Sequence, residues 1–301
     1  MSVKFIAFAD LHADIMFDAV RRVRVVIEAA ERERADFILN LGDIMYPPND
    51  FLIKNGVALR KDKWFYCERD EEKREILALL NGCGIPVYHV MGNHDSDACP
   101  KGVFVDFMGM PHTFHSFEVN GYLFAALDTS EGPEPSISEG QLAWLEAEIL
   151  SSGKPAILLS HHPLYEGGIE NHDRVARFIT RINADKKRVC LSINGHTHLD
   201  GMQYFAGVPC LDINSISCHW VGWEYRYARY DDATEKAYPY INCVVPYEEA
   251  VFACVTVSRG NASVKGTSGA FAEPCPYTLG MPESERHYIC TAGITDREIP
   301  L

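Results

Sequence analysis

Three features are missing from this sequence of 301 residues, and each absence excludes a class of protein. No stretch approaches the run of about 18 apolar residues that a membrane-spanning helix requires, and the first apolar run is too short for a secretory signal. The ten cysteines include no C-x-x-C pair, so we expect reduced, mostly buried thiols and a cytoplasmic protein. The sequence also lacks a long basic block, and its formal net charge of −14 argues against long nucleic acids as partners.

The apolar content is 47%, which is enough for a chain of 301 residues to bury a substantial core. Because the protein is acidic, acting on an anionic substrate would require a strong local positive charge. Bound metal cations can supply such a charge.

One apolar run ends in a cluster of polar side chains. Residues 87–91 are followed by Gly92-Asn93-His94-Asp95, so a glycine is followed at once by an amide, an imidazole and a carboxylate. Glycine lets the backbone turn tightly without a clash at Cβ. The pattern therefore predicts a buried strand whose end presents these three side chains to one small space.

The same arrangement recurs four more times along the chain. Apolar segments at residues 3–9, 37–41, 156–160 and 189–193 lead into Asp10-Leu11-His12, Gly42-Asp43, His161 and Gly195-His196-Thr197-His198. On an extended chain Asp10 and His12 would point to the same face, since they are two residues apart. Ligands of open α/β sheets bind beyond the carboxyl ends of the strands, so five such ends can line one site.

The side chains collected in this way are a candidate set of metal ligands. They are those of Asp10, His12, Asp43, Asn93, His161, His196 and His198. Carboxylate, imidazole and amide oxygen suit Mn, Fe or Zn, and seven ligands are too many for one tetrahedral ion. Each short motif alone could be a turn with satisfied side chains, but two ions that share a carboxylate would use the whole set.

These motifs resemble the five signature motifs of the calcineurin-like metallophosphoesterase superfamily, in the expected order over about residues 3–215. The resemblance implies an α/β fold with two packed mixed β-sheets flanked by helices, a four-layer α/β/β/α sandwich. It further implies a binuclear centre in which Asp43 bridges the two ions. One ion would take Asp10, His12, Asp43 and His198, and the other Asp43, Asn93, His161 and His196. Segments 116–117, 127–129 and 141–145 further resemble the branch that contains the class III cyclic-nucleotide phosphodiesterases and related diphosphatases.

The implied chemistry is phosphoester hydrolysis. Two cations can lower the pKa of a bridging water so that hydroxide attacks phosphorus in line, and they can hold the phosphoryl oxygens as charge develops. His94 lies outside the inferred ligand set, so we expect it to bind the phosphate or to protonate the leaving alkoxide, with Asp95 fixing its tautomer.

We therefore predict a metal-dependent hydrolase of a small phosphodiester, such as a cyclic nucleotide or a glycerophosphodiester. A phosphomonoesterase and a nucleotide pyrophosphatase remain alternatives on the same site. A non-catalytic protein-binding scaffold is an alternative from another class, although a decayed site would lack ligands or His94, and all are present.

Several further side chains keep two interpretations. His162 could contact the ligands or the substrate, or it could only pack, because it would point away from His161 on an extended chain. Tyr46 has the spacing of the tyrosine that ligates ferric iron in purple acid phosphatases, but those enzymes lack a histidine at the position of His12. His89 is expected to pack within its strand. His112, His115, His219 and His287 are left unassigned.

The remaining pattern predicts helices at about residues 20–30, 71–80, 139–149 and 172–183, a hairpin turning at Asn120-Gly121, and an irregular segment after Asp95. The aromatic cluster at residues 219–247 could stack a base or could form core. We expect a single domain over residues 1–301, with a catalytic core at 1–215 and an extension at 216–301 of extra strands that cover the site. The sequence does not indicate an oligomeric state.

Overall fold

The computed structural model describes residues 2–13, 15–16, 18–45, 71–96, 100–232, 235, 240–285 and 287–301. Tyr46, for which two interpretations were left open above, lies outside the described residues.

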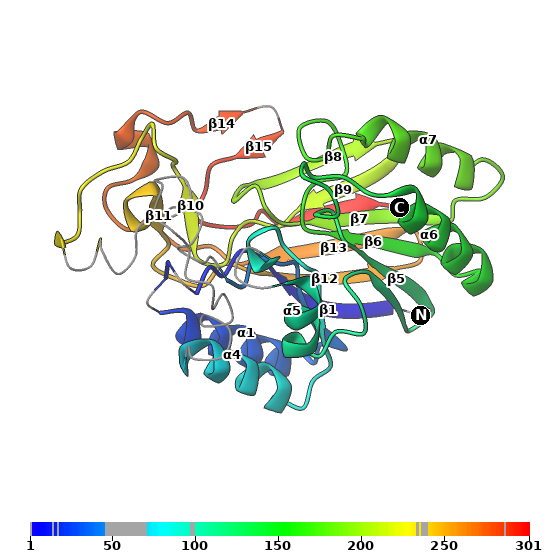
Figure 1. Ribbon diagram of the computed structural model, residues 1–301, viewed down its shortest axis with the longest axis horizontal. Helices are drawn as coiled ribbons and strands as arrows, with labels where there is room; N and C mark the ends of the chain where they lie inside the picture. Colours follow the sequence, from blue (N-terminus) through cyan, green and yellow to red (C-terminus); the bar gives the residue numbers. More distant parts are fainter. Residues whose placement is uncertain are drawn as a thin grey trace.

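Two mixed β-sheets pack face to face between layers of helices (Figure 1). The six-stranded sheet has the order β16-β13-β12-β1-β2-β3. Its strands are β1 (Ser2–Phe8), β2 (Phe37–Asn40), β3 (Val87–His89), β12 (Ala253–Ser258), β13 (Asn261–Gly266) and β16 (Arg297–Pro300). Strands β1, β2 and β3 run parallel, so their carboxyl ends lie at one edge.

The eight-stranded sheet has the order β14-β15-β8-β9-β7-β6-β5-β4. Its strands are β4 (His115–Val119), β5 (Tyr122–Leu127), β6 (Ala156–Ser160), β7 (Val189–Asn194), β8 (Asp200–Phe205), β9 (Val208–Asp212), β14 (Ser284–Glu285) and β15 (Tyr288–Ile289). Strands β5, β6, β7 and β9 run parallel. A separate pair joins β10 (Cys218–Trp220) to β11 (Val244–Pro246).

Alternation along the strands explains why the sheets stack. In β1, Phe5 packs between the sheets and its ring meets that of Phe124 edge-on at 5.8 Å, while Ile6 and Phe8 belong to the cluster beneath the helices. Successive side chains of a strand point to opposite faces, so an all-apolar strand contributes to two cores at once. The predicted fold of two mixed sheets flanked by helices is confirmed.

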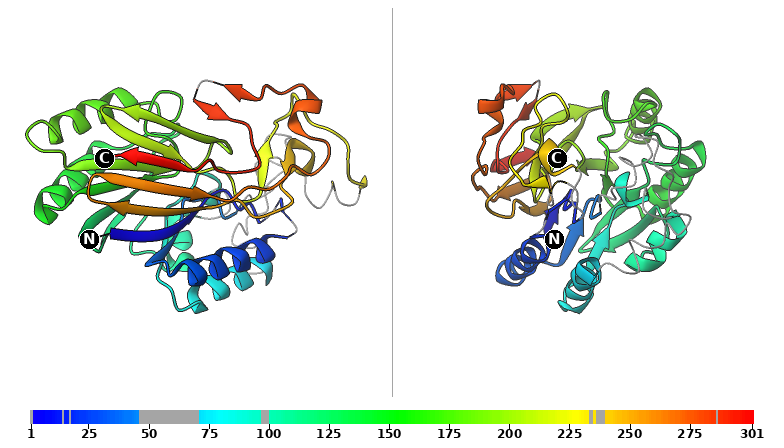
Figure 2. Two further views of the ribbon diagram at one scale, coloured as in Figure 1. Left: turned by 180° about the vertical axis from the view of Figure 1, so that it is seen from behind. Right: turned by 60° about the vertical axis from the view of Figure 1, so that its left-hand side comes forward.

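The helices form the outer layers (Figure 2). Helices α1 (Ala19–Glu33), α4 (Glu71–Gly82) and α5 (Lys101–Met108) cover the six-stranded sheet, and α6 (Glu139–Ser152) and α7 (His172–Ile182) cover the other. Short 3₁₀ helices are η1 (His94–Ser96), η2 (Ile241–Cys243) and η3 (Pro276–Leu279). None of the helices in the described ranges is long and apolar enough to cross a bilayer.

Short sequence patterns predicted the positions of most of these helices and strands. Ser138 caps α6 by accepting a hydrogen bond from the Gln141 N–H, and Asn120 and Gly121 turn the β4–β5 hairpin with φ of 48° and 86°. The irregular segment expected after Asp95 was partly wrong, because α5 forms there and buries Phe104 and Met108. The start of α5 carries no capping signal, since Pro100 at the N-cap makes no side-chain hydrogen bond.

Residues beyond 216 are hydrogen-bonded into both sheets. Strand β12 pairs antiparallel with β1, and β13 and β16 extend that sheet outward. Strand β15 pairs with β8 of the other sheet. In Figure 1 these C-terminal strands, drawn in orange and red, run alongside the N-terminal strand β1 and beyond β8.

Candidate metal centre

The ends of β1, β2, β3, β6 and β7 meet at one place, and backbone hydrogen bonds tie their loops together. The N–H groups of Asp10 and His12 donate to the carbonyls of Gly42 and Asp43, both at 3.0 Å, and the Gly195 N–H donates to the His161 carbonyl at 3.1 Å. The loops are therefore held by bonds between backbones that are 31 to 34 residues apart in sequence.

Five of the side chains at these ends stand on residues with a left-handed backbone. Asp10, His12, Asp43, His196 and His198 have φ of 56°, 48°, 52°, 72° and 53°. The expectation that Asp10 and His12 share a face of an extended chain was wrong, since the chain turns at both residues. A non-glycine residue in this region costs about 1–2 kcal/mol, and such strain gathers at functional sites.

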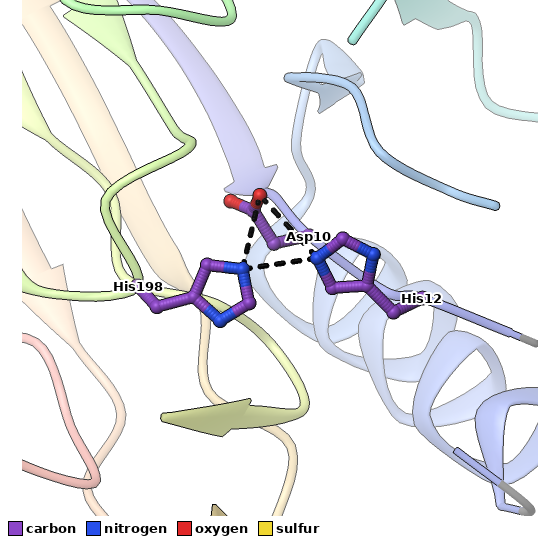
Figure 3. A group of neighbouring side chains, drawn as sticks. All are labelled: Asp10, His12 and His198. Carbon is purple, nitrogen blue, oxygen red and sulfur yellow. Dashed lines mark hydrogen bonds and ion pairs between the residues drawn. The ribbon is translucent and has the colours of Figure 1, made fainter. Parts of the chain in front are cut away.

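The first group of converging side chains is Asp10, His12 and His198 (Figure 3). The Nε2 atoms of His12 and His198 are 2.9 Å apart, and Asp10 Oδ1 lies 3.4 Å from His198 Nε2 and 3.8 Å from His12 Nε2. His198 Nδ1 lies 2.9 Å from the carbonyl of Cys218, which makes Nδ1 the donor and aims Nε2 at the group. All three residues are buried.

The second group is Asp43, His161 and His196, with Asn93 beside it. His161 Nε2 lies 3.1 Å from Asp43 Oδ2, 3.1 Å from Asn93 Oδ1 and 3.2 Å from His196 Nδ1. Its Nδ1 lies 2.9 Å from the carbonyl of Leu41 and so donates there. The same Nε2 is 4.0 Å from Asp10 Oδ1, which places the two groups next to each other.

The chemistry of these donors fits cations. Without a positive charge between them, lone pairs on imidazole, carboxylate and amide atoms would face one another. Asp10 Oδ1 is buried and accepts no hydrogen bond from any described residue, which would be costly unless a cation compensates it. The donor set therefore suits bound metal ions of the kind that the sequence predicted.

The pKa values of three of these histidines show which of them carry an additional proton. Burial disfavours the charged form of His161, but the charge of Asp43 outweighs it and raises the pKa to about 9. Burial likewise opposes protonation of His198, and the charge of Asp10 nonetheless raises its pKa well above the usual range. Burial and the neighbouring His198 lower the pKa of His12 to about 3. His12 is therefore neutral, and its Nε2 accepts the hydrogen bond that His198 Nε2 donates.

Two glycines leave room for the second group. A Cβ on Gly92 would lie 2.0 Å from Asp43 Oδ1 and 2.3 Å from Asp43 N. Gly42 has φ of +100°, and a Cβ there would lie 2.8 Å from His161 Nδ1. Both glycines are needed because the strand ends approach each other so closely.

His94 and Asp95 have different surroundings. The His94 N–H donates to Asp43 Oδ1 at 2.9 Å, and its half-buried ring lies 5.9 Å from that of His12. Asp95 is fully buried and accepts from the backbone N–H groups of Asp43, Met45 and Gly92. These bonds brace the loops, and the expected effect of Asp95 on the His94 tautomer stays a prediction. Burial and the charge of Asp43 raise the pKa of Asp95 to about 7.

His162 and His89 both lie in buried surroundings. His162 Nδ1 is 2.7 Å from Thr129 Oγ1, and its ring lies 4.1 Å from that of His196. It contacts a candidate ligand and is not among the described residues that line the cavity. His89 is buried in β3, with its Nδ1 3.2 Å from Asn40 Nδ2.

A cavity of about 310 Å³ opens over the two groups. It is lined by His12, Asp43, His94, His196, Thr197, His198, Leu199, His219, Trp220, Met281, Pro282 and Cys290. The sequence left His219 unassigned and did not single out Cys290. Only the tertiary structure brings these two side chains to the centre, since a lone histidine or cysteine gives no signal in the sequence.

The loop that carries His196 and His198 has a buried anchor that the sequence analysis also missed. Asn194 Nδ2 donates to Asp212 Oδ1 at 2.7 Å, and the Tyr165 hydroxyl donates to the same oxygen. His287 Nε2 lies 3.1 Å from the Tyr165 hydroxyl. Asp212 follows the apolar residues 208–211, so the pattern of a strand ending in a carboxylate could have found it.

Comparisons with known proteins show the family and the fold. The calcineurin-like phosphoesterase family matches residues 3–200. A dimetal phosphatase from Danio rerio has a similar structure, with a TM-score of 0.60 and 15% identity over 88% of this chain and 95% of that one. GAP50, described as the anchor in the inner membrane complex of Plasmodium, has a TM-score of 0.50 and 16% identity over 89% of this chain and 84% of that one. A search of curated proteins finds no match.

The chain belongs to the calcineurin-like phosphoesterase family, whose members depend on metal ions and typically bind two. It is a metal-dependent phosphoester hydrolase, and the two groups of converging side chains are its candidate metal-binding residues. At 15% and 16% identity, the two similar structures show the shared fold alone.

Proposed function

We propose that this protein hydrolyses a small phosphodiester, such as a cyclic nucleotide or a glycerophosphodiester, with two ions of Mn, Fe or Zn. One observation carries the proposal: side chains of both ligand groups line a single cavity, so two ions there could hold one phosphoryl group. His12 and His198 come from the first group, and Asp43 and His196 from the second.

The ligand assignment follows the two groups. Asp10, His12 and His198 would hold one ion, and Asn93, His161 and His196 would hold the other. Asp43 would be shared by both, which is supported by its place beside His161 and by its charge, which opposes the fall in the pKa of His12 caused by burial. When bound, two such ions lower the pKa of a bound water and neutralise phosphoryl oxygens.

His94 is the proposed proton donor to the leaving alkoxide. Its backbone N–H is fixed on Asp43 Oδ1, and its side chain lines the cavity beside His12. An imidazole in that place can reach the ester oxygen that leaves, and histidine transfers protons near neutral pH. Asp95 supports this arrangement by holding the backbone of Asp43 and Gly92.

Charge favours a diester over a monoester. A phosphodiester carries one negative charge at neutral pH, whereas a monoester approaches two. The described residues that line the cavity include Asp43 but no lysine or arginine, so little besides the metal ions would balance a second charge. The resemblance to the class III phosphodiesterase branch points the same way, and a monoesterase or a nucleotide pyrophosphatase is the alternative.

A scaffold on the same fold is the alternative from another class, since GAP50 is described as an anchor. The presence of all seven proposed ligands and of His94 argues against it.

We also propose a cytoplasmic location, supported by the free state of the described cysteines.

The test is a pair of initial rates on bis(p-nitrophenyl) phosphate and p-nitrophenyl phosphate in Mn²⁺, with metal-stripped protein as the control. We expect metal-dependent hydrolysis with a higher kcat/KM for the diester. A preference for the monoester would replace the proposal by the phosphatase. No turnover on either compound by protein that has bound two ions would favour the scaffold. Metal analysis of the purified protein identifies the native ions.

A further inference from the structure

The cavity has a second half that the proposed chemistry does not use. Beyond the proposed ligands and His94, its wall consists of Thr197 and of six residues that we call the apolar half, namely Leu199, His219, Trp220, Met281, Pro282 and Cys290. Four of these side chains are apolar, and none of the six is a lysine, arginine, aspartate or glutamate. The two halves therefore offer a phosphoryl group and the rest of its ester very different surroundings.

Hydrogen bonds attach one wall of the apolar half to a proposed metal ligand. The Cys218 carbonyl accepts from His198 Nδ1 at 2.9 Å, and the next residue returns the contact, with His219 Nδ1 lying 3.1 Å from the His198 carbonyl. Trp220 follows on the same short strand, β10, and its ring packs against Tyr240 at 6.1 Å. A group that contacts Trp220 is thereby held beside the metal centre.

The rest of the apolar half, apart from Leu199, comes from the C-terminal part of the chain. Cys290 is buried, and its Sγ lies 3.5 Å from His219 Nε2. Burial raises the pKa of this thiol to about 11, which keeps it uncharged at neutral pH. The segment that carries Met281 is closed by two backbone bonds, from Met281 N to Pro276 O at 3.1 Å and from Cys290 N to Glu283 O at 3.0 Å.

We propose that the apolar half binds an uncharged aromatic group on one esterified alcohol of the substrate. A tryptophan beside leucine, methionine and proline offers a surface on which a flat ring can stack and lose its contact with water. A second phosphate in the same place would lose hydration and meet no cationic side chain among the described lining residues. The volume of about 310 Å³ is at the small end of ligand pockets, which suits one ring beside the phosphoryl group.

This inference rests on the proposed function and narrows it. Among small phosphodiesters it selects those with an aryl or nucleobase-bearing alcohol over those with only glycerol or with an additional phosphate. Because it concerns binding, it can be tested without turnover.

The experiment is calorimetric titration of the Mn²⁺-loaded protein with methylphosphonate, phenylphosphonate and 4-carboxyphenylphosphonate. Their P–C bonds are not cleaved as esters are, so the titration measures binding alone. We expect phenylphosphonate to bind about tenfold or more tightly than methylphosphonate, from the stacking on Trp220. The added carboxylate of the third compound should remove this gain. Equal affinity for the first two compounds, or tighter binding of the third, would overturn the inference.

Variants test whether the preference for phenylphosphonate depends on the residues of the apolar half. Trp220→Ala should bring phenylphosphonate to the affinity of methylphosphonate, while the matched control Trp223→Ala should not, since Trp223 is 50% exposed and is not among the described lining residues. Met281→Lys tests the wall without removing the tryptophan, and it should raise the affinity for 4-carboxyphenylphosphonate above that for phenylphosphonate. An unchanged order of affinities in Met281→Lys would count against the inference even if Trp220→Ala failed to fold.

The result separates this inference from the proposed function. Hydrolysis of bis(p-nitrophenyl) phosphate with no preference for phenylphosphonate would reject the inference and leave the phosphodiesterase intact. Preference for phenylphosphonate without hydrolysis of either chromogenic ester would keep the inference and reject the proposed function. Failure of all three phosphonates to bind to metal-loaded protein would reject the inference.

Discussion

Gly92 lies against the carboxylate of Asp43, so Gly92→Ala should move the proposed bridging ligand. The added Cβ would lie 2.0 Å from Asp43 Oδ1, 2.3 Å from Asp43 N and 2.8 Å from its carboxyl carbon. Ordinary contacts of a Cβ begin at about 3.4 Å, so the carboxylate and its backbone would need to move by about 1 Å.

The consequence for activity can be bounded. A displacement of about 1 Å at a reacting centre costs about 100-fold in rate, equivalent to about 2.7 kcal/mol of transition-state stabilisation. We therefore expect kcat/KM for bis(p-nitrophenyl) phosphate to fall by at least about 100-fold, together with weaker binding of at least one of two Mn²⁺ ions. Overpacking should also lower the free energy of unfolding by about 1–3 kcal/mol.

The assay measures kcat/KM, bound metal per chain and denaturant unfolding for the variant. The matched control is Gly140→Ala in α6, where the nearest atom to an added Cβ is Ser138 Oγ at 3.8 Å. This control should keep its activity and gain about 0.5–1 kcal/mol of stability, because alanine favours a helix over glycine. If Gly92→Ala retained both ions and its full rate, the assignment of Asp43 to the bridging position would be refuted.

Three further predictions concern single residues. Asp43→Asn should abolish Mn²⁺-dependent hydrolysis, and near-normal rates with two bound ions would contradict bridging. His94→Ala should slow esters of poor leaving groups more than esters of good ones, as a lost proton donor requires, whereas equal losses across the series would leave His94 a phosphate-binding role only. Metal binding should release protons, because His161 must be neutral to hold a cation. Burial lowers the pKa of His161, but the charge of Asp43 outweighs burial and raises this pKa to about 9. The affinity for Mn²⁺ should thus rise with pH up to about 9. Calorimetry in two buffers of different ionisation enthalpy measures the protons released, and equal binding enthalpies in the two buffers would contradict this prediction.

Several elements could be predicted because their signals are local. The turn at Asn120-Gly121 and the cap at Ser138 depend on residues within four positions of each other. The apolar strands β2, β6 and β7 end where the sequence places them, next to Asp43, His161 and His196, to within one or two residues. A buried strand needs a continuous apolar run, and a polar residue that ends the run marks its edge.

The route by which Asp10 and His12 reach the site could not be predicted. Both residues adopt left-handed backbone, held by hydrogen bonds to Gly42 and Asp43 in the loop that follows β2. The strand rule that assigned them to one face therefore gave the right pair for a wrong reason. The backbone partners of Asp95 could not be predicted either, because they include Asp43 and Met45, about 50 residues earlier in the chain.

By itself, the sequence determined the order of the ligand motifs, the strands that they end and the family to which the chain belongs, since each of these depends on residue types at short spacing. The resemblance implied the two sets of ligands, but only the tertiary structure decided the distances within them and what faces them across the cavity. Cys290 and His219 are 71 residues apart, and Asp10 and His198 are 188 apart, yet each pair is in contact. Such contacts depend on the packing of whole sheets, and no local pattern of residues encodes it.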